Sequence, residues 1–185
     1  MDSLHVGLKV QRYVECWRPK VGWERWARAC NFVGLEKLAA RIPRYLAWTD
    51  DSFNIVTTAG KNKVLDAAFK TGLTTPAWYV GLVDNASWTA YAAADVLSSH
   101  TGWIEGNPYT GNRKTWTAGT VSGGSVDNSG AVAAFAITGT LTVRGCFLAD
   151  AASGTSGTLF GEGDFANARS VISGDTLNVT ITITD

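Results

Sequence analysis

Three side chains in the middle of the chain could act together as acids and bases: Asp95, His100 and Glu105. A glycosidase, for example, needs two carboxyl groups held at a fixed separation on rigid elements. The segment that carries these residues, "DVLSSHTGWIE", is typical of a short helical turn, a glycine loop and the start of a strand. An aspartate in such a turn often hydrogen-bonds to local backbone instead. We therefore favour a structural role for these residues and predict that the protein is not an enzyme.

The remaining polar residues form no recognised metal or cofactor motif. The only histidines, His5 and His100, are far apart in the sequence. Glu162 and Asp164 lie in a glycine-rich stretch that we predict to be a loop, and they lack the ligand spacing of an EF-hand. That stretch also lacks the lysine and helix start of a phosphate-binding loop, and no serine lies in a G-x-S-x-G elbow. We predict neither a metal nor a cofactor.

Aromatic side chains are a second candidate feature. Trp78 and Tyr79 lie in a short apolar run and are predicted to be core residues. Five others lie in predicted loops or at strand edges: Trp88, Tyr91, Trp103, Tyr109 and Trp116. Exposed aromatic rings can stack on sugars, but such residues also close the ends of a sandwich or fill an oligomer interface. We favour packing or an interface, with sugar binding as the alternative.

The charges divide unevenly along a chain that is neutral overall. Residues 1–45 hold nine Lys and Arg against four acids, a local charge of +5, which leaves −5 for the rest of the 185 residues. Overall neutrality argues against nucleic acid as the main partner. A basic segment on an acidic body can dock on an acidic surface, although a solvated amphipathic helix also explains the pattern.

Other features indicate a soluble protein made in the cytoplasm. The three cysteines lack the spacing of a disulfide framework or a metal finger. The first residues, "MDSLHVGLKV", lack the features of a secretory signal, and no apolar run approaches the length that spans a bilayer. We expect no membrane partner.

Residues 1–49 are predicted to form a strand followed by a basic, aromatic helical arm. Alternation in Leu8–Trp17 predicts a strand whose apolar face contains Leu8, Val10, Val14 and Cys16. Apolar residues spaced three and four apart in Trp23–Ile42 predict a helix, which Gly34 breaks or kinks and Pro43 ends.

Residues 50–185 are predicted to form the body of the protein. A helix is expected at Ala59–Gly72, with an apolar stripe of Val64, Leu65, Ala68 and Phe69. Strands are expected at Ala77–Val83 and on both sides of a break at Gly139-Thr140 within Ala131–Asp150. Strict alternation predicts a terminal strand, Thr176–Thr184. Its core-facing side chains are Leu177, Val179, Ile181 and Ile183. Its solvent-facing side chains are Asn178, Thr180, Thr182 and Thr184.

Short strands separated by glycine-rich turns indicate the fold class. The sequence predicts a mainly β protein, an antiparallel β-sandwich of the jelly-roll or immunoglobulin-like type with about seven or eight strands. An N-terminal helical extension and one further short helix complete the expected architecture.

Several motifs occur in a fixed order along the body. They are N-x-V-x-x-x-G-x-N-x-x-L-D at Asn54–Asp66, W-Y-V-G-L at Trp78–Leu82, and D-x-x-x-S-H-x-G-W-x-E at Asp95–Glu105. A closing segment with a Gly/Ser loop, "RSV" and "GDTL" follows. In these motifs the chain resembles a family of small virion structural proteins of tailed bacteriophages. The resemblance covers about residues 50–185, and the region Arg18–Ala47 looks like an expansion of the family pattern.

The resemblance implies a structural virion component without a cofactor or a reaction. We expect a capsid decoration (cement) protein on the outside of the shell, with the major capsid protein as partner and with self-association, for instance as a trimer. The alternative is a tail-tip, fibre or head–tail connector-associated protein that binds host surface polysaccharide.

The arm, Val14–Tyr45, is the candidate partner interface. Tryptophan and arginine dominate interface hot spots, and both are abundant here. The candidate residues are Trp17, Arg18, Trp23, Arg25, Trp26, Arg28, Arg41 and Arg44. In the alternative interpretation Trp23, Trp26 and Cys30 pack the helix onto the protein's own sandwich and the arginines lie in water.

Overall fold

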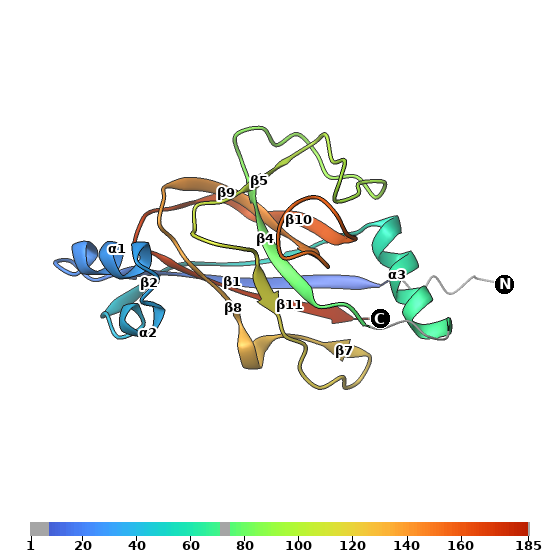
Figure 1. Ribbon diagram of the computed structural model, residues 1–185, viewed down its shortest axis with the longest axis horizontal. Helices are drawn as coiled ribbons and strands as arrows, with labels where there is room; N and C mark the ends of the chain where they lie inside the picture. Colours follow the sequence, from blue (N-terminus) through green and yellow to red (C-terminus); the bar gives the residue numbers. More distant parts are fainter. Residues whose placement is uncertain (1–7, 71–74, 185) are drawn as a thin grey trace.

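The computed structural model describes residues 8–70 and 75–184, and in this part of the chain two antiparallel sheets face each other (Figure 1). In the first sheet β1 pairs with β2 and with β11, which also pairs with β7 and β8. Its strands are β1 (Lys9–Pro19), β2 (Arg44–Phe53), β7 (Ser125–Val126), β8 (Ala133–Ala136) and β11 (Thr176–Thr184).

The second sheet has the order β3-β10-β9-β4, and β4 also pairs with β5 and β6. Its strands are β3 (Ile55–Val56), β4 (Trp78–Asp84), β5 (Ile104–Gly106), β6 (Lys114–Trp116), β9 (Leu141–Ala149) and β10 (Leu159–Val171). The mainly β, sandwich-like architecture is therefore confirmed. The expected number of seven or eight strands is too low, because several strands are only two or three residues long and too short to show alternation.

The terminal strand β11 lies inside the first sheet, as its alternation predicts. Leu177, Val179 and Ile181 are fully buried in the main core, and Ile183 packs against that core from its edge. The opposite side of the strand is half-buried between its neighbours and not fully exposed to water. Burial of each such side chain stabilises the fold by roughly 1.5–3 kcal/mol.

Strand β1 confirms the predicted inner face and adds a charged residue to it. Val10, Val14 and Cys16 are buried, and Arg12 between them is fully buried as well. Arg12 Nη1 donates to the Cys146 carbonyl oxygen at 2.9 Å, so it ties the first sheet to the second. Apolar alternation cannot reveal a buried arginine, since the pattern assigns charged residues to water.

The strands on either side of Gly139-Thr140 are confirmed, but they do not form a hairpin. β8 pairs with β11 in the first sheet, whereas β9 pairs with β10 and β4 in the second. The chain crosses between the sheets at this break. Strand β4 matches the predicted strand Ala77–Val83 closely.

The predicted helix Trp23–Ile42 is broken into α1 (Glu24–Phe32) and α2 (Glu36–Ala39). Gly34 lies at the break with a φ of 71°, a conformation that glycine adopts without strain. Residues 20–43, which connect β1 to β2 and contain both helices, are called the tip below. In Figure 1 the tip projects from one end of the molecule. The expected boundary at residue 50 falls inside β2, and β1 is an integral strand of the sandwich.

Helix α3 (Thr58–Phe69) lies at the end of the molecule opposite the tip (Figure 1). Its predicted apolar stripe is exposed, and Phe69 retains 82% of its accessible surface, so this stripe does not pack into the core as the apolar face of a surface helix usually does. The helix contacts β10 through Gly60, where an added Cβ would collide with the Phe160 backbone. The predicted stop at Gly72 lies outside the described residues.

Candidate functional site

The three candidate acid–base residues are each engaged in local structure. Asp95 accepts a hydrogen bond from the Ala92 backbone N–H at 3.1 Å. Glu105 forms a two-pronged ion pair with Arg113, at 2.9 and 2.8 Å. His100 stacks on Trp103, with ring centroids 3.8 Å apart. These contacts favour the structural interpretation over a catalytic group, which must keep its proton-transfer atoms available to a substrate.

Glu162 and Asp164 do not lie in a loop, contrary to the sequence-based prediction. Both belong to β10, where Gly161 pairs with β9 and β3 and Gly163 pairs with β9, between two irregularities in the register with β9. Glu162 is fully buried and accepts a hydrogen bond from Ala92 N–H at 3.2 Å. Burial, and then the neighbouring Asp95 carboxyl, raise the pKa of Glu162 to about 8. In the described residues no group of three or more His, Cys, Asp or Glu side chains could hold a metal ion.

The loop aromatics are mostly packed inside the protein. Trp103, Tyr109 and Trp116 are buried, and Trp116 Nε1 donates to the Ile181 carbonyl oxygen at 3.1 Å. Trp88 is half-buried beneath the guanidinium of Arg144, 3.8 Å from the ring centroid. These rings therefore serve packing, and they do not form an exposed platform for a sugar.

Polar contacts near the turn before β11 fix both the end of β1 and the tip that follows it. Asp175 is fully buried in the turn before β11, and its Oδ2 accepts from Arg18 Nε at 3.2 Å and from the Ile172 N–H at 3.0 Å. Asn31 of α1 donates to the carbonyl oxygens of Ile137 and Asp175. The ion pair between Arg18 and the buried carboxylate fixes the end of β1, because breaking it leaves the charge without compensation. The two hydrogen bonds of Asn31 give α1 of the tip a defined position on the body.

The far side of the tip exposes large apolar side chains. Ala27, Cys30, Ala39 and Ile42 form a small buried cluster of their own between the two helices. Around it, side chains of the tip remain exposed: Trp23 (45%), Trp26 (66%), Phe32 (77%), Val33 (61%), Leu35 (51%) and Leu38 (52%). Trp23, Trp26 and Leu38 line a groove of about 530 Å³ together with Cys30, Arg41 and Ile42. Contiguous exposed apolar surface of this kind marks interaction sites.

The eight predicted interface residues fall into two groups. Trp23, Arg25, Trp26, Arg28 and Arg41 lie exposed on the tip. The three arginines among them pair with no acidic side chain that the structure describes. Trp17, Arg18 and Arg44 instead lie where the tip joins the sheet. Sequence reasoning missed the exposed apolar residues Phe32, at the end of α1, and Val33 and Leu35, in the turn after it; their only signal is a run of apolar residues around Gly34.

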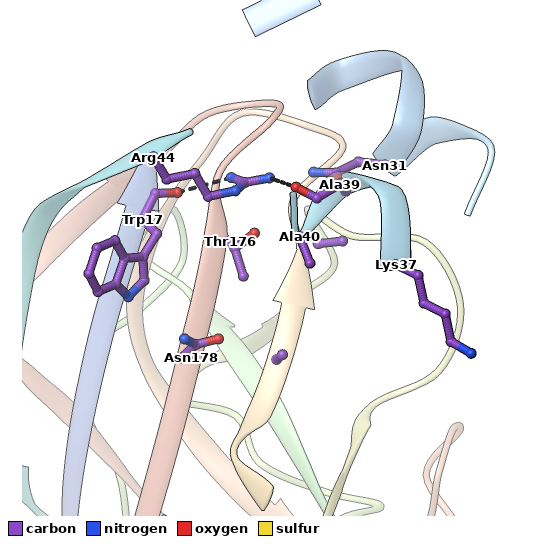
Figure 2. Close-up of a pocket in the computed structure, with 10 residues that line it drawn as sticks. Trp17, Asn31, Lys37, Ala39, Ala40, Arg44, Thr176 and Asn178 are labelled. Atoms are coloured by element: carbon purple, nitrogen blue, oxygen red, sulfur yellow. Dashed lines mark hydrogen bonds between the residues drawn. The ribbon is translucent and has the colours of Figure 1, made fainter. Parts of the chain in front are cut away.

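A second groove, of about 510 Å³, lies between α2 and the outer face of the first sheet (Figure 2). Its lining residues are Trp17, Asn31, Lys37, Ala39, Ala40, Arg44, Ala134, Ala136, Thr176 and Asn178. Residues from β1, α2, β8 and β11 meet here, so the groove exists only in the folded chain.

In comparisons with known proteins, no protein-family model and no curated protein matches the chain. Among the described residues, none of the helices has the length and apolar character needed to cross a membrane.

Proposed function

We propose that the protein is a non-enzymatic structural component of a tailed-bacteriophage virion. Within that class we propose a capsid decoration (cement) protein, made in the host cytoplasm and bound to the outside of the major capsid protein shell. The ordered motifs Asn54–Asp66, Trp78–Leu82 and Asp95–Glu105, which resemble those of such proteins, support the class.

The observation that carries the binding role is the exposed apolar and basic surface of the tip. Trp26 and Leu38 supply apolar area, and Arg25, Arg28 and Arg41 supply positive charge around it. Tryptophan and arginine together are the residue types that contribute most at interface hot spots. A matching partner surface is apolar at its centre and acidic at its rim, which is the surface we propose for the capsid shell.

Such a tip can stabilise a shell by mass action. A protein that binds the assembled shell and not its separate subunits shifts the equilibrium toward the shell. Contacts to neighbouring subunits, or between copies of this protein such as a trimer, add further stability through effective concentration.

The finer type of the sandwich is also a proposal. The chain passes between the sheets after β8 and again between β10 and β11. Crossings of this kind are typical of Greek-key sandwiches, and they support the jelly-roll or immunoglobulin-like type.

The test is binding of purified protein to phage capsids that lack it, measured by co-sedimentation. We expect Trp26→Ser combined with Leu38→Ser to reduce capsid affinity at least tenfold, about 1.4 kcal/mol, because both side chains are exposed and lie in the groove of the tip. Phe69→Ser is the matched control, since it removes an aromatic ring that is also exposed, at the opposite end of the molecule. Unchanged binding by the tip variant would contradict the proposal.

A further inference from the structure

We propose that the groove between α2 and the first sheet binds a saccharide that carries a carboxylate. This function goes beyond the structural role proposed above and does not depend on it. The two grooves share no lining residue, although Lys37 belongs to the tip.

The groove presents an aromatic wall, a polar floor and a cationic rim. In Figure 2 Trp17 and Lys37 lie on opposite sides of the groove, and Thr176 and Asn178 lie on β11 between them. Ala134 and Ala136 of β8 complete the floor, and their small side chains leave the hollow open. A volume of about 510 Å³ falls within the range of sites that bind small ligands.

The groove is rigid because buried and half-buried contacts hold both of its sides. Arg44 Nη1 donates to the Gly174 carbonyl oxygen at 2.7 Å and to that of Trp17 at 3.3 Å, and its Nη2 donates to the Ala39 carbonyl oxygen at 3.4 Å. One guanidinium therefore joins β1, α2 and the turn before β11, as Figure 2 shows in part. A preformed site costs less conformational entropy when a ligand binds.

The polar groups of the groove match the chemistry of an acidic sugar. Trp17 Nε1 donates to Glu15 at 3.0 Å, which fixes the indole so that its ring can serve as a stacking wall. The Thr176 hydroxyl and the Asn178 amide make no hydrogen bond within the described part of the protein, so they can bind sugar hydroxyls. Lys37 is exposed and without an ion pair to any described acidic side chain. Arg44 uses three of its five N–H donors on backbone carbonyl oxygens, so Lys37 is the less engaged of the two cations at the groove and the one we assign to a carboxylate.

The floor argues for a saccharide over an extended peptide. Peptide grooves provide separate pockets for alternate side chains, or a free strand edge for backbone pairing. Here the floor is the face of the sheet, and its flat alanine surface beside one indole suits a sugar ring. We therefore commit to the saccharide and treat peptide binding as an outcome that would refute it.

The test uses saturation-transfer NMR and titration of intrinsic tryptophan fluorescence with three probes. Digalacturonic acid and sialyllactose carry a carboxylate, and lactose is the neutral control. We expect at least one acidic probe to bind more tightly than lactose. Lys37→Gln should weaken the acidic probe about fivefold to tenfold and leave lactose unaffected, as expected for loss of one charged contact.

Trp17→Ala should abolish saccharide binding. Trp17→Phe keeps an aromatic ring and should retain part of the binding, and it replaces the alanine variant in the test if that variant does not fold. Trp26→Ala is the matched control, because this tryptophan lies in the other groove. The proposal is refuted if no acidic saccharide binds, if binding is unchanged in Lys37→Gln and Trp17→Phe, or if only an extended peptide occupies the groove. The same variants are tested for capsid binding, which they should retain. Loss of saccharide binding with normal capsid binding, or the reverse, then tells the two proposals apart.

Discussion

Replacement of the buried Glu162 by glutamine is expected to change how stability depends on pH. Glu162 lies on β10 with no accessible surface, and its Oε1 accepts from Ala92 N–H at 3.2 Å. Burial, with a further contribution from Asp95, raises its pKa from 4.5 to about 8. Glutamine keeps the size of the side chain and the acceptor for Ala92, and it can donate to Asp95 without ever carrying a charge.

The sign of the effect follows from the raised pKa. Below pH 4.5 the carboxyl is protonated in both the folded and the unfolded chain, so it imposes no penalty on folding. Between pH 4.5 and 8 the unfolded chain releases the proton that the folded protein keeps, and stability falls as the pH rises. The difference between the two pKa values sets a ceiling of about 5 kcal/mol at about 1.4 kcal/mol per pH unit. Relaxation around the charge reduces the expected loss to about 2–4 kcal/mol.

The assay is urea unfolding of the wild type and of Glu162→Gln at pH 5, 7 and 9. We expect similar stabilities at pH 5 and an advantage for the variant that grows to about 2–4 kcal/mol at pH 9. An exposed acid, changed as Asp51→Asn, controls for the general effect of removing one negative charge. If the difference between Glu162→Gln and the wild type stays constant from pH 5 to pH 9, Glu162 does not titrate in this range and the reasoning is wrong.

Two further predictions concern the elements that position the ends of the molecule. Thr57→Ala should destabilise the protein by about 1 kcal/mol in thermal unfolding, because the Thr57 hydroxyl accepts from Gly60 N–H at 3.0 Å and caps α3. The control Thr57→Ser keeps the hydroxyl and should be close to the wild type in stability. Asp175→Asn should cost about 2–3 kcal/mol in urea unfolding, because it removes the buried charge that pairs with Arg18. An unfolding midpoint equal to that of the wild type in Thr57→Ala or in Asp175→Asn would show that the corresponding contact does not stabilise the fold.

Local patterns predicted the strands of this fold well where one face is buried. The alternation of Thr176–Thr184 and of Leu8–Trp17 identified β11 and β1, since a strand with one face packed on the core buries every second side chain. Gly34 was likewise identified as a helix break, because its conformation depends on the residue itself.

Elements whose role depends on distant contacts were predicted less well. The apolar stripe of helix α3 was identified, but no local pattern shows that the helix contacts the body through Gly60 and leaves that stripe exposed. The stretch around Glu162 looks like a loop in the sequence because it is rich in glycine, yet pairing with β9 makes it a central strand. The groove between α2 and the first sheet brings together Trp17, Lys37 and Asn178, and no local pattern connects residues so far apart in the sequence.

The central claim, that this is a capsid decoration protein, is tested most directly by its copy number in purified virions. Quantitative mass spectrometry against the major capsid protein gives this number. Our account predicts hundreds of copies per particle, because a decoration protein occupies repeated positions on the shell. A handful of copies would indicate a tail or connector component, and absence from the particle would contradict a virion role altogether.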